Sequence, residues 1–255
     1  MPVTFAVANQ KGGVAKTTTA HALGSALAER GRRVLLVDLD PQGCLTFSLG
    51  IDPNDLAKSL HDVFVHRIPA TEVLLKAGEL HVLPATIDLA GTEVHMLTRA
   101  GREYALARAL DPIKNDYDTI LVDCPPSLGV LTINGLTAAD EVLIPLQCET
   151  LSHRGVGQLL ETIEDVKSYT NPGLKVRGVV ATMFDARTKL GREVLDDVRT
   201  RYGVEVLEPP IPKSVRVAEA PGRGRSVLEH AGRSTSAEAY RKLAAGLEGE
   251  EVAHQ

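Results

Sequence analysis

Residues 9–19 read Asn-Gln-Lys-Gly-Gly-Val-Ala-Lys-Thr-Thr-Thr, and this stretch is the most informative part of the sequence. It follows an apolar, β-prone run at Val3–Ala8 and leads into a helix-forming segment. A strand, a glycine turn and a helix start in that order direct backbone N–H groups and a lysine ammonium at one point, which suits a phosphate. The pattern predicts a nucleotide site; the alternative is a surface turn rich in lysine and glycine. The residues expected to contact the nucleotide are Lys11, Gly12, Gly13, Val14, Ala15, Lys16, Thr17 and Thr18.

The loop departs from the ordinary phosphate-loop pattern G-x-x-x-x-G-K-[ST], because Gln10 and Ala15 stand where its two glycines belong. It carries instead a second lysine, Lys11, five residues before Lys16. The methyl group of Ala15 fits such a loop only if the local φ angle is negative or the phosphate lies slightly farther away. We therefore expect a lowered nucleotide affinity or turnover.

The composition predicts an ordinary soluble globule. The chain has 255 residues, 44% of them apolar and 24% charged, which is enough for one buried α/β core. We expect a single domain over residues 1–255, with the last few residues disordered. Aromatic residues make up 4% and tryptophan is absent, which leaves little material for stacking single-stranded bases. Three cysteines without a C-x-x-C pair, and no signal peptide, favour reduced thiols in a cytoplasm.

Short β-branched runs alternate with helical patterns along the chain, which is typical of a parallel sheet with helices on both faces. The expected strands are Val3–Ala8, Arg33–Asp38, His81–Leu83, Thr119–Asp123, Glu141–Leu146, Val176–Met183 and Val204–Leu207. The expected helices are Thr17–Glu29, Leu89–Leu110, Gly129–Ala138, Arg154–Tyr169, Leu190–Arg201 and Ala237–Leu247. The predicted fold is α/β, a doubly wound, mostly parallel sheet whose ligand lies beyond the carboxyl ends of the strands.

Acidic residues follow two of the apolar strands. Asp38 and Asp40 come where Val34–Val37 gives way to a turn, and Asp123 ends the run Ile120–Val122. A lone aspartate after a strand is commonly a turn former or a helix cap. Beside a phosphate loop, however, the Asp123 pattern is that of a Walker B carboxylate, which holds Mg²⁺, often through water.

The Lys-Gly-Gly-Val-x-Lys-Thr-Thr arrangement resembles the deviant Walker A motif of the ParA/MinD family of dimerising ATPases. The resemblance implies that Lys16 neutralises the β- and γ-phosphates of ATP and that Thr17 is a ligand of Mg²⁺. It also implies that Lys11 reaches across a homodimer to the partner's phosphates. A lysine at the entrance of the loop points away from its own phosphates, so a second subunit gives it a purpose.

The acidic runs extend this resemblance. The Asp-x-Asp-Pro-Gln run that begins at Asp38 matches the family's switch I, and the Asp-x-Pro-Pro-Ser run that begins at Asp123 resembles its switch II. By resemblance, Asp40 orients or polarises the attacking water, so that Lys11, Lys16 and Asp40 are the catalytic residues. Asp38 supports Mg²⁺ or the lysine environment, which gives Thr17, Asp38 and Asp123 as the metal residues.

The later segments resemble the chromosome- and plasmid-partition branch, ParA proper. They run over residues 142–147, 182–188 and 211–221. In that branch the stretch Pro210 to Pro212 borders the adenine, which names Pro210 and Pro212 as nucleotide contacts. Arg187 and Arg216 would contact DNA phosphates on the dimer, and a ParB-like protein would stimulate the ATPase at the nucleoid.

The charge distribution agrees with DNA binding. The net charge is -5, yet residues 175–233 hold twelve Lys/Arg against eight Asp/Glu. Without a recognition helix or interleaved aromatics, DNA binding is expected to be non-specific, directed at the backbone and salt-dependent. Basic clusters are also found as simple solvated faces. The candidate DNA-binding residues are Arg187, Lys213, Arg216, Arg223 and Arg225.

Three other functions compete with an ATPase of DNA partition. A MinD-like membrane-positioning ATPase needs a basic amphipathic C-terminal helix, whereas residues 247–255 are acidic, so no membrane partner is expected. A metabolic ligase on the same scaffold would bind a small substrate beside the γ-phosphate, and a reductase would need cluster-ligating cysteines that this sequence lacks. A nucleotide-gated scaffold with little hydrolysis fits the alanine at position 15.

Overall fold

The computed structural model describes residues 2–148 and 152–251, and it is built around one eight-stranded sheet. The strand order is β3-β4-β2-β5-β1-β6-β7-β8, and every neighbouring pair is parallel except β3 and β4. The strands are β1 (Val3–Val7), β2 (Val34–Asp38), β3 (Leu75–Ala77), β4 (Leu80–Leu83), β5 (Thr119–Asp123), β6 (Glu141–Gln147), β7 (Lys175–Thr182) and β8 (Val206–Leu207).

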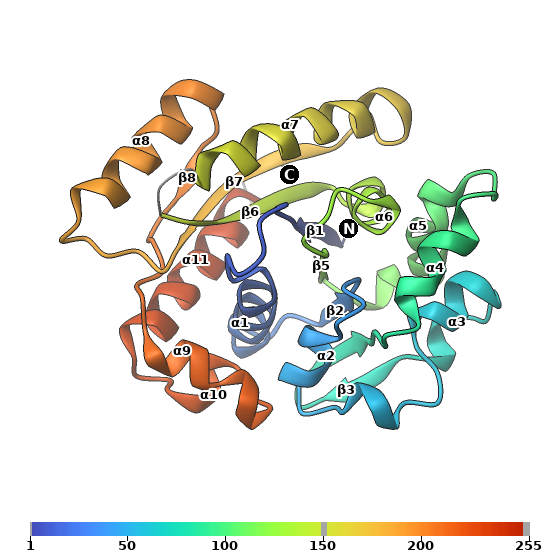
Figure 1. Cartoon of the computed structure of the whole chain (residues 1–255). Helices are drawn as coiled ribbons and strands as arrows, with labels where there is room; N and C mark the ends of the chain where they lie inside the picture. The colour runs from blue at the N-terminus through green and yellow to red at the C-terminus, as the bar shows by residue number, and fades with distance from the viewer. Residues whose placement is uncertain (1, 149–151, 252–255) are drawn as a thin grey trace.

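Helices connect these strands and cover the sheet (Figure 1). The α-helices are α1 (Lys16–Glu29), α2 (Cys44–Ser48), α3 (Leu60–Val65), α4 (Leu89–Met96), α5 (Ala105–Leu110), α6 (Val130–Ala138), α7 (Ser152–Tyr169), α8 (Lys189–Tyr202), α9 (Val215–Glu219), α10 (Val227–His230) and α11 (Thr235–Glu251). Short 3-10 turns lie at η1 (Pro53–Asp55), η2 (Ala70–Glu72), η3 (Arg102–Tyr104), η4 (Lys114–Asp116) and η5 (Pro221–Arg223).

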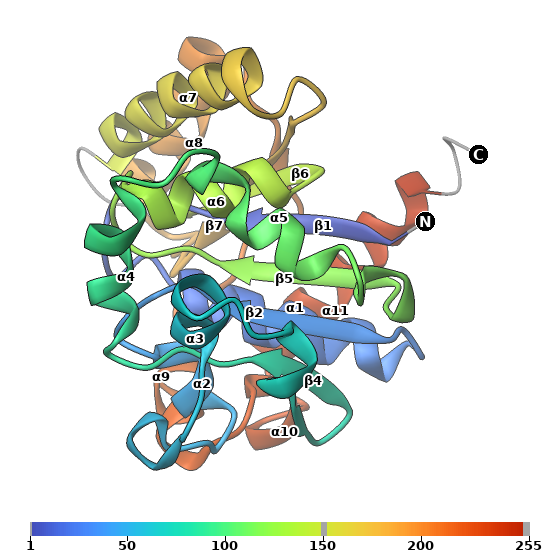
Figure 2. The ribbon, with the colours of Figure 1, turned by 90° about the vertical axis from the view of Figure 1, so that its right-hand side faces the viewer.

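Two hydrophobic cores, one on each face, hold the helices to the sheet. On β5, Leu121 belongs to the core beneath α1, α10 and α11, whereas Ile120 and Val122 belong to the core beneath helices α3 to α8. Alternate residues of one strand point to opposite faces, so a strand that is apolar throughout is buried on both. Figure 2, turned from Figure 1, shows the strands running between the two helical layers.

The structure confirms the predicted fold class, and most expected elements lie within a few residues of their predicted bounds. The long helix expected at Leu89–Leu110 is wrong: the chain forms α4, a turn and then α5. Gly101 lies between them with a φ of 65°, in the left-handed region that ends a helix. The disordered end that the sequence predicts falls at residues 252–255, outside the described residues.

Candidate active site

Contacts from two neighbouring strands fix the loop between β1 and α1. The Asn9 side chain donates from Nδ2 to the Pro145 carbonyl of β6 (2.8 Å) and accepts from the Lys11 amide (3.0 Å). On the other side, the Thr182 hydroxyl of β7 donates to the carbonyl of Val14 (3.0 Å). The loop is therefore anchored at the carboxyl ends of the central strands, where an open α/β sheet binds its ligand.

Lys16 is the first residue of α1, and its side chain folds back over the loop. Its Nζ donates to the Lys11 carbonyl (3.2 Å), and only 7% of the residue is exposed. Burial lowers the pKa of Lys16, while the charges of Asp123 and Asp40 act to raise it. The helix N-terminus adds its own positive field at this point. An anion seated in the loop would therefore gain from both the ammonium and the helix.

Ala15 has a left-handed backbone, with φ 67° and ψ 34°. The first condition for an unstrained alanine here, a negative φ, is thus not met. A residue with a Cβ pays about 1–2 kcal/mol in this region, which glycine does not. Residues other than glycine that are held in such a strained backbone conformation cluster at functional sites.

The strain at Ala15 gives a first prediction. Ala15→Gly should raise the free energy of unfolding by about 0.5–1 kcal/mol, since relief of strain outweighs the greater freedom of glycine in the unfolded chain. Urea unfolding without nucleotide measures this, with Ala220→Gly, at a position of negative φ, as the matched control. A destabilised Ala15→Gly protein would contradict the strained conformation.

Two aspartates face each other at the ends of adjacent strands. Asp38 of β2 and Asp123 of β5 are paired in register, and both are fully buried. Asp38 accepts from the amide and hydroxyl of Thr46 (2.8 and 2.7 Å) and from the Asp40 amide (3.2 Å). Burial nevertheless raises its pKa to about 6. The Asp38 carboxylate thus holds the start of α2 in place.

Asp123 differs from Asp38, because neither of its oxygens has a hydrogen-bond partner among the described residues. Burial, followed by the charge of Asp38, raises its pKa well above the usual range; the nearby Thr17 hydroxyl and Lys16 oppose this effect. A buried carboxylate without partners is costly unless a ligand satisfies it. The Thr17 hydroxyl and the Asp123 carboxylate form an oxygen donor set that suits Mg²⁺.

The metal would need further ligands from outside the protein. Within residues 2–148 and 152–251, no three His, Cys, Asp or Glu side chains are grouped to hold an ion by themselves. Mg²⁺ is usually bound by one or two carboxylates together with substrate phosphates and waters. The donor set is therefore of the kind that takes a metal together with a nucleotide.

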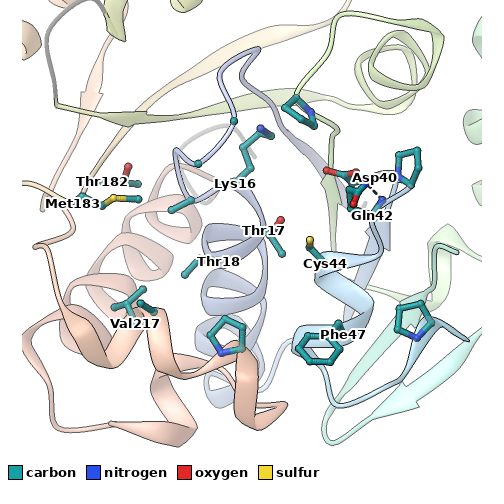
Figure 3. A pocket seen from close by; sticks show the side chains of 18 of the residues that line it. Lys16, Thr17, Thr18, Asp40, Gln42, Cys44, Phe47, Thr182, Met183 and Val217 are labelled. Carbon is teal, nitrogen blue, oxygen red and sulfur yellow. Dashed lines mark hydrogen bonds between the residues drawn. The ribbon is translucent and has the colours of Figure 1, made fainter. Parts of the chain in front are cut away.

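Asp40 lies at the rim of the same site, where it is partly exposed (Figure 3). Its Oδ1 accepts from the Gln42 amide (2.9 Å), which closes the turn that leads into α2. Asp40 and Lys16 both line one cleft, which also takes in the Thr17 and Thr18 side chains. The structure thus brings together the lysine, the threonines and the rim carboxylate that the sequence singled out.

This cleft measures about 1300 Å³ and runs from the loop towards α9 and α2. Pro212 lines it, as expected for an adenine contact, whereas Pro210 borders a neighbouring depression. Lys11 and Val14 lie outside the lining, and Val14 is buried beneath the loop. The sequence analysis missed several lining side chains, since they sit in ordinary apolar patterns: Phe47, Met183, Val217 and Tyr240.

The candidate DNA residues are all exposed, but they fall into two groups. Arg187 and Lys213 line the depression beside the cleft, where Arg233 and Lys242 join them. Arg216, on α9, forms an ion pair with Glu219 (3.2 Å). The other two, Arg223 and Arg225, lie on the turn between α9 and α10.

No described helix has the length and apolar character needed to cross a membrane.

Comparisons with known proteins agree with this site. The family model described as "AAA domain", AAA_31, matches residues 3–176. The sporulation initiation inhibitor protein Soj of Bacillus subtilis is 46% identical over 94% of this chain and 96% of its own. The chromosome partitioning protein ParA of Caulobacter vibrioides is 46% identical over 94% of this chain and 91% of its own.

A solved structure from Mycobacterium smegmatis is also similar. It is named cobyrinic acid a,c-diamide synthase with bound ADP and magnesium, is 53% identical and has a TM-score of 0.91. It covers all of this chain, which in turn covers 97% of that one. Sequence identity of 46% with Soj and with ParA over almost the whole chain establishes the family to which this chain belongs. The chain belongs to the AAA_31 family and, within it, to the ParA branch of the ParA/MinD ATPases.

Proposed function

We propose that this chain is a Mg²⁺-dependent ATPase that dimerises around two ATP molecules and binds DNA in that state. The observation that carries the proposal is a buried Lys16 at the end of an anchored phosphate loop, together with the unsatisfied Asp123 carboxylate, whose charge acts on Lys16. Phosphoryl transfer to water requires mainly positioning and charge stabilisation, which such a site supplies. The expected reaction converts ATP and water to ADP and phosphate.

Each residue of the site then has a role. The amides of the loop and the Lys16 ammonium bind the phosphates, and Thr17 and Asp123 hold the magnesium, which supplies charge neutralisation when bound. Asp38 positions α2 through Thr46, so its contribution to the metal is indirect. Asp40, at the rim beside the phosphates, orients the water and accepts its proton.

The place of Lys11 supports the proposed dimerisation. It lies at the outer end of the loop, against Gly155 of α7, and outside the lining of its own cleft. In a homodimer that faces loop to loop, its ammonium would approach the partner's triphosphate. The ATP-bound dimer would be held by this contact and would separate after hydrolysis.

The dimer would bind double-stranded DNA without sequence preference, through Arg187, Lys213, Arg216 and their neighbours. The relatives named for chromosome partitioning favour this role. The protein would then act in the cytoplasm at the nucleoid, with a ParB-like protein as its activator. The test is ATP turnover measured alone, with random duplex and with the activator. Turnover that neither of them changes would contradict the role in partition.

Arg216→Glu tests the DNA surface. Reversing this exposed charge, twice per dimer, should weaken duplex binding about tenfold or more at 0.1 M salt and flatten its salt dependence, while ATP binding is retained. Fluorescence anisotropy with a labelled random duplex measures both. The charge-matched control is Lys76→Glu on β3, the edge strand opposite β8, which should bind as the parent does. If both variants bind the duplex with equal affinity, DNA binds to another surface of the protein.

The name of the Mycobacterium smegmatis structure favours a second candidate function, ATP-dependent amide formation on a corrinoid carboxylate. Such a ligase would also activate its substrate with the γ-phosphate, so ATP binding alone does not separate the two functions. ADP release should be compared in the presence of cobyrinic acid plus glutamine and in the presence of duplex DNA. Amide product from the first mixture would establish the ligase, and stimulation only by DNA supports the partition ATPase.

A further inference from the structure

The helices α3, α4 and α5 lie on the side of the molecule that faces the viewer in Figure 2. A second pocket is lined by residues of these helices and of the segments that join them. It encloses about 640 Å³ and shares no lining residue with the nucleotide cleft. Its floor is apolar, formed by the buried side chains of Val63, Phe64, Met96 and Ile113. Its volume falls in the range of ligand-binding pockets, roughly 300–1,000 Å³.

Four arginines line this pocket, and no carboxylate does: Arg67, Arg99, Arg102 and Arg108. We call it the arginine pocket. A concave site with charges of one sign over low-dielectric walls concentrates its field on whatever enters. A ligand for it should carry negative charge and should cover apolar surface.

Backbone carbonyls hold three of these four guanidiniums without cancelling their charge, and one of these contacts is that of Arg102 with the Leu97 carbonyl. Arg99 donates to the carbonyls of Phe64 (2.7 Å) and Val65 (3.1 Å), and Arg108 donates to the carbonyl of Gly101 (2.7 Å). Each guanidinium has five N–H donors, so donors remain for a ligand.

Among the described residues, only one arginine of the pocket is paired with an acid. That arginine is Arg102, whose Nε lies 3.0 Å from Glu103. The pocket therefore keeps most of its positive charge.

Arg67 adds an independent sign of function, because it has a left-handed backbone with a φ of 58°. Only two other non-glycine residues in the described chain share this feature, Ala15 and Met183, and both line the nucleotide cleft. Such a conformation strains the backbone of an arginine, whereas glycine adopts it freely. Strained residues cluster where ligands bind.

We propose that the arginine pocket binds an acidic segment of a partner protein, in which carboxylates flank an apolar side chain. The carboxylates would take the free N–H groups of the arginines, as guanidinium forks favour. The apolar side chain would rest on the floor of the pocket. The site is separate from the nucleotide cleft and does not depend on the function proposed for it.

The test uses a fluorescein-labelled peptide of sequence Glu-Glu-Leu-Glu-Glu-Leu and fluorescence anisotropy with the full chain. The control peptides replace both leucines by serine, or all glutamates by lysine. The acidic apolar peptide should bind at least about tenfold more tightly than either control, because both the charge and the apolar contact are needed. Equal binding of the serine peptide would mark a bare anion site and overturn the proposal.

Variants of the pocket make the test specific. Arg67→Glu combined with Arg108→Glu should weaken the peptide at least about tenfold, since both side chains are exposed and their reversal repels the carboxylates. Lys76→Glu, a single charge reversal outside the pocket, should leave affinity within about twofold. Unchanged affinity in the double variant would overturn the proposal.

Arg67→Gly distinguishes the role of Arg67 in peptide binding from its effect on stability. It should raise the midpoint of thermal unfolding by about 2 °C through relief of the left-handed strain, and at the same time weaken the peptide. A variant that gains stability and binds the peptide as before would show that Arg67 has no part in binding.

Discussion

Lys16→Ala is expected to lower ATP affinity at least about 100-fold, to the limit of detection. A charge-assisted hydrogen bond to a phosphate contributes about 3 kcal/mol in a site shielded from water, which corresponds to that factor. The side chain is buried and already points back over the phosphate loop, where its ammonium would meet the phosphates directly. Titration calorimetry with ATP and Mg²⁺ gives the affinity directly.

Lys11→Ala is the matched control for this experiment. It removes a lysine from the same loop but from outside the cleft, so the monomer should bind ADP with an affinity within about threefold of the parent. Both variants should keep the cooperative unfolding of the parent. ATP binding by Lys16→Ala at the parental affinity would mean that the loop does not hold the phosphates.

Asp40→Ala should reduce the rate of ATP hydrolysis by about 10²–10⁴-fold, the usual contribution of a positioned general base. ATP binding should persist, because the carboxylate lies at the rim and the phosphate contacts come from the loop. The variant should therefore accumulate as an ATP-bound dimer. Single-turnover hydrolysis measures the chemical step without interference from product release.

Asp88→Ala controls for the loss of a negative charge. Asp88 is exposed and lines the same cleft, yet it is distant in sequence from the turn that contains Asp40. Its removal should leave hydrolysis within about threefold of the parent. If Asp40→Ala hydrolyses ATP at the normal rate, another group places the water.

The fold was accessible from the sequence because local and global signals agree. Runs such as Ile120–Val122 are apolar on every residue, and the structure buries them between two cores. The loop ahead of α1 was recognisable because glycines, lysines and threonines at this spacing have few other uses. The signals conflict at Gly101, a glycine inside an apolar helical pattern. There the predicted helix Leu89–Leu110 is interrupted.

Other parts of the site depend on tertiary contacts that no local pattern records. The sequence gives Asp38 and Asp123 the same appearance, an aspartate after a buried strand. Thr46, eight residues beyond Asp38, satisfies one of them and leaves the other unpartnered. Tyr240 likewise reads as a core residue of α11, although it also lines the cleft and lies within hydrogen-bonding distance of the Thr19 hydroxyl (3.3 Å).

The arginine pocket lay beyond sequence analysis for a similar reason. Its four arginines are scattered over residues 67–108 and become neighbours only because α3 packs against α4 and α5. The basic segment that the sequence does reveal, residues 175–233, is a different surface. Counting charges along the sequence therefore identified the basic segment at residues 175–233 but not the arginine pocket.

The central claim is that ATP brings two copies of this chain together. Sedimentation velocity of the purified protein with Mg²⁺, in ADP and in saturating ATP, tests it most directly; the Asp40→Ala variant guards against turnover during the run. The account predicts single chains in ADP and dimers in ATP, with Lys11→Ala remaining single in both. Single chains of the parent and of Asp40→Ala in saturating ATP would contradict it.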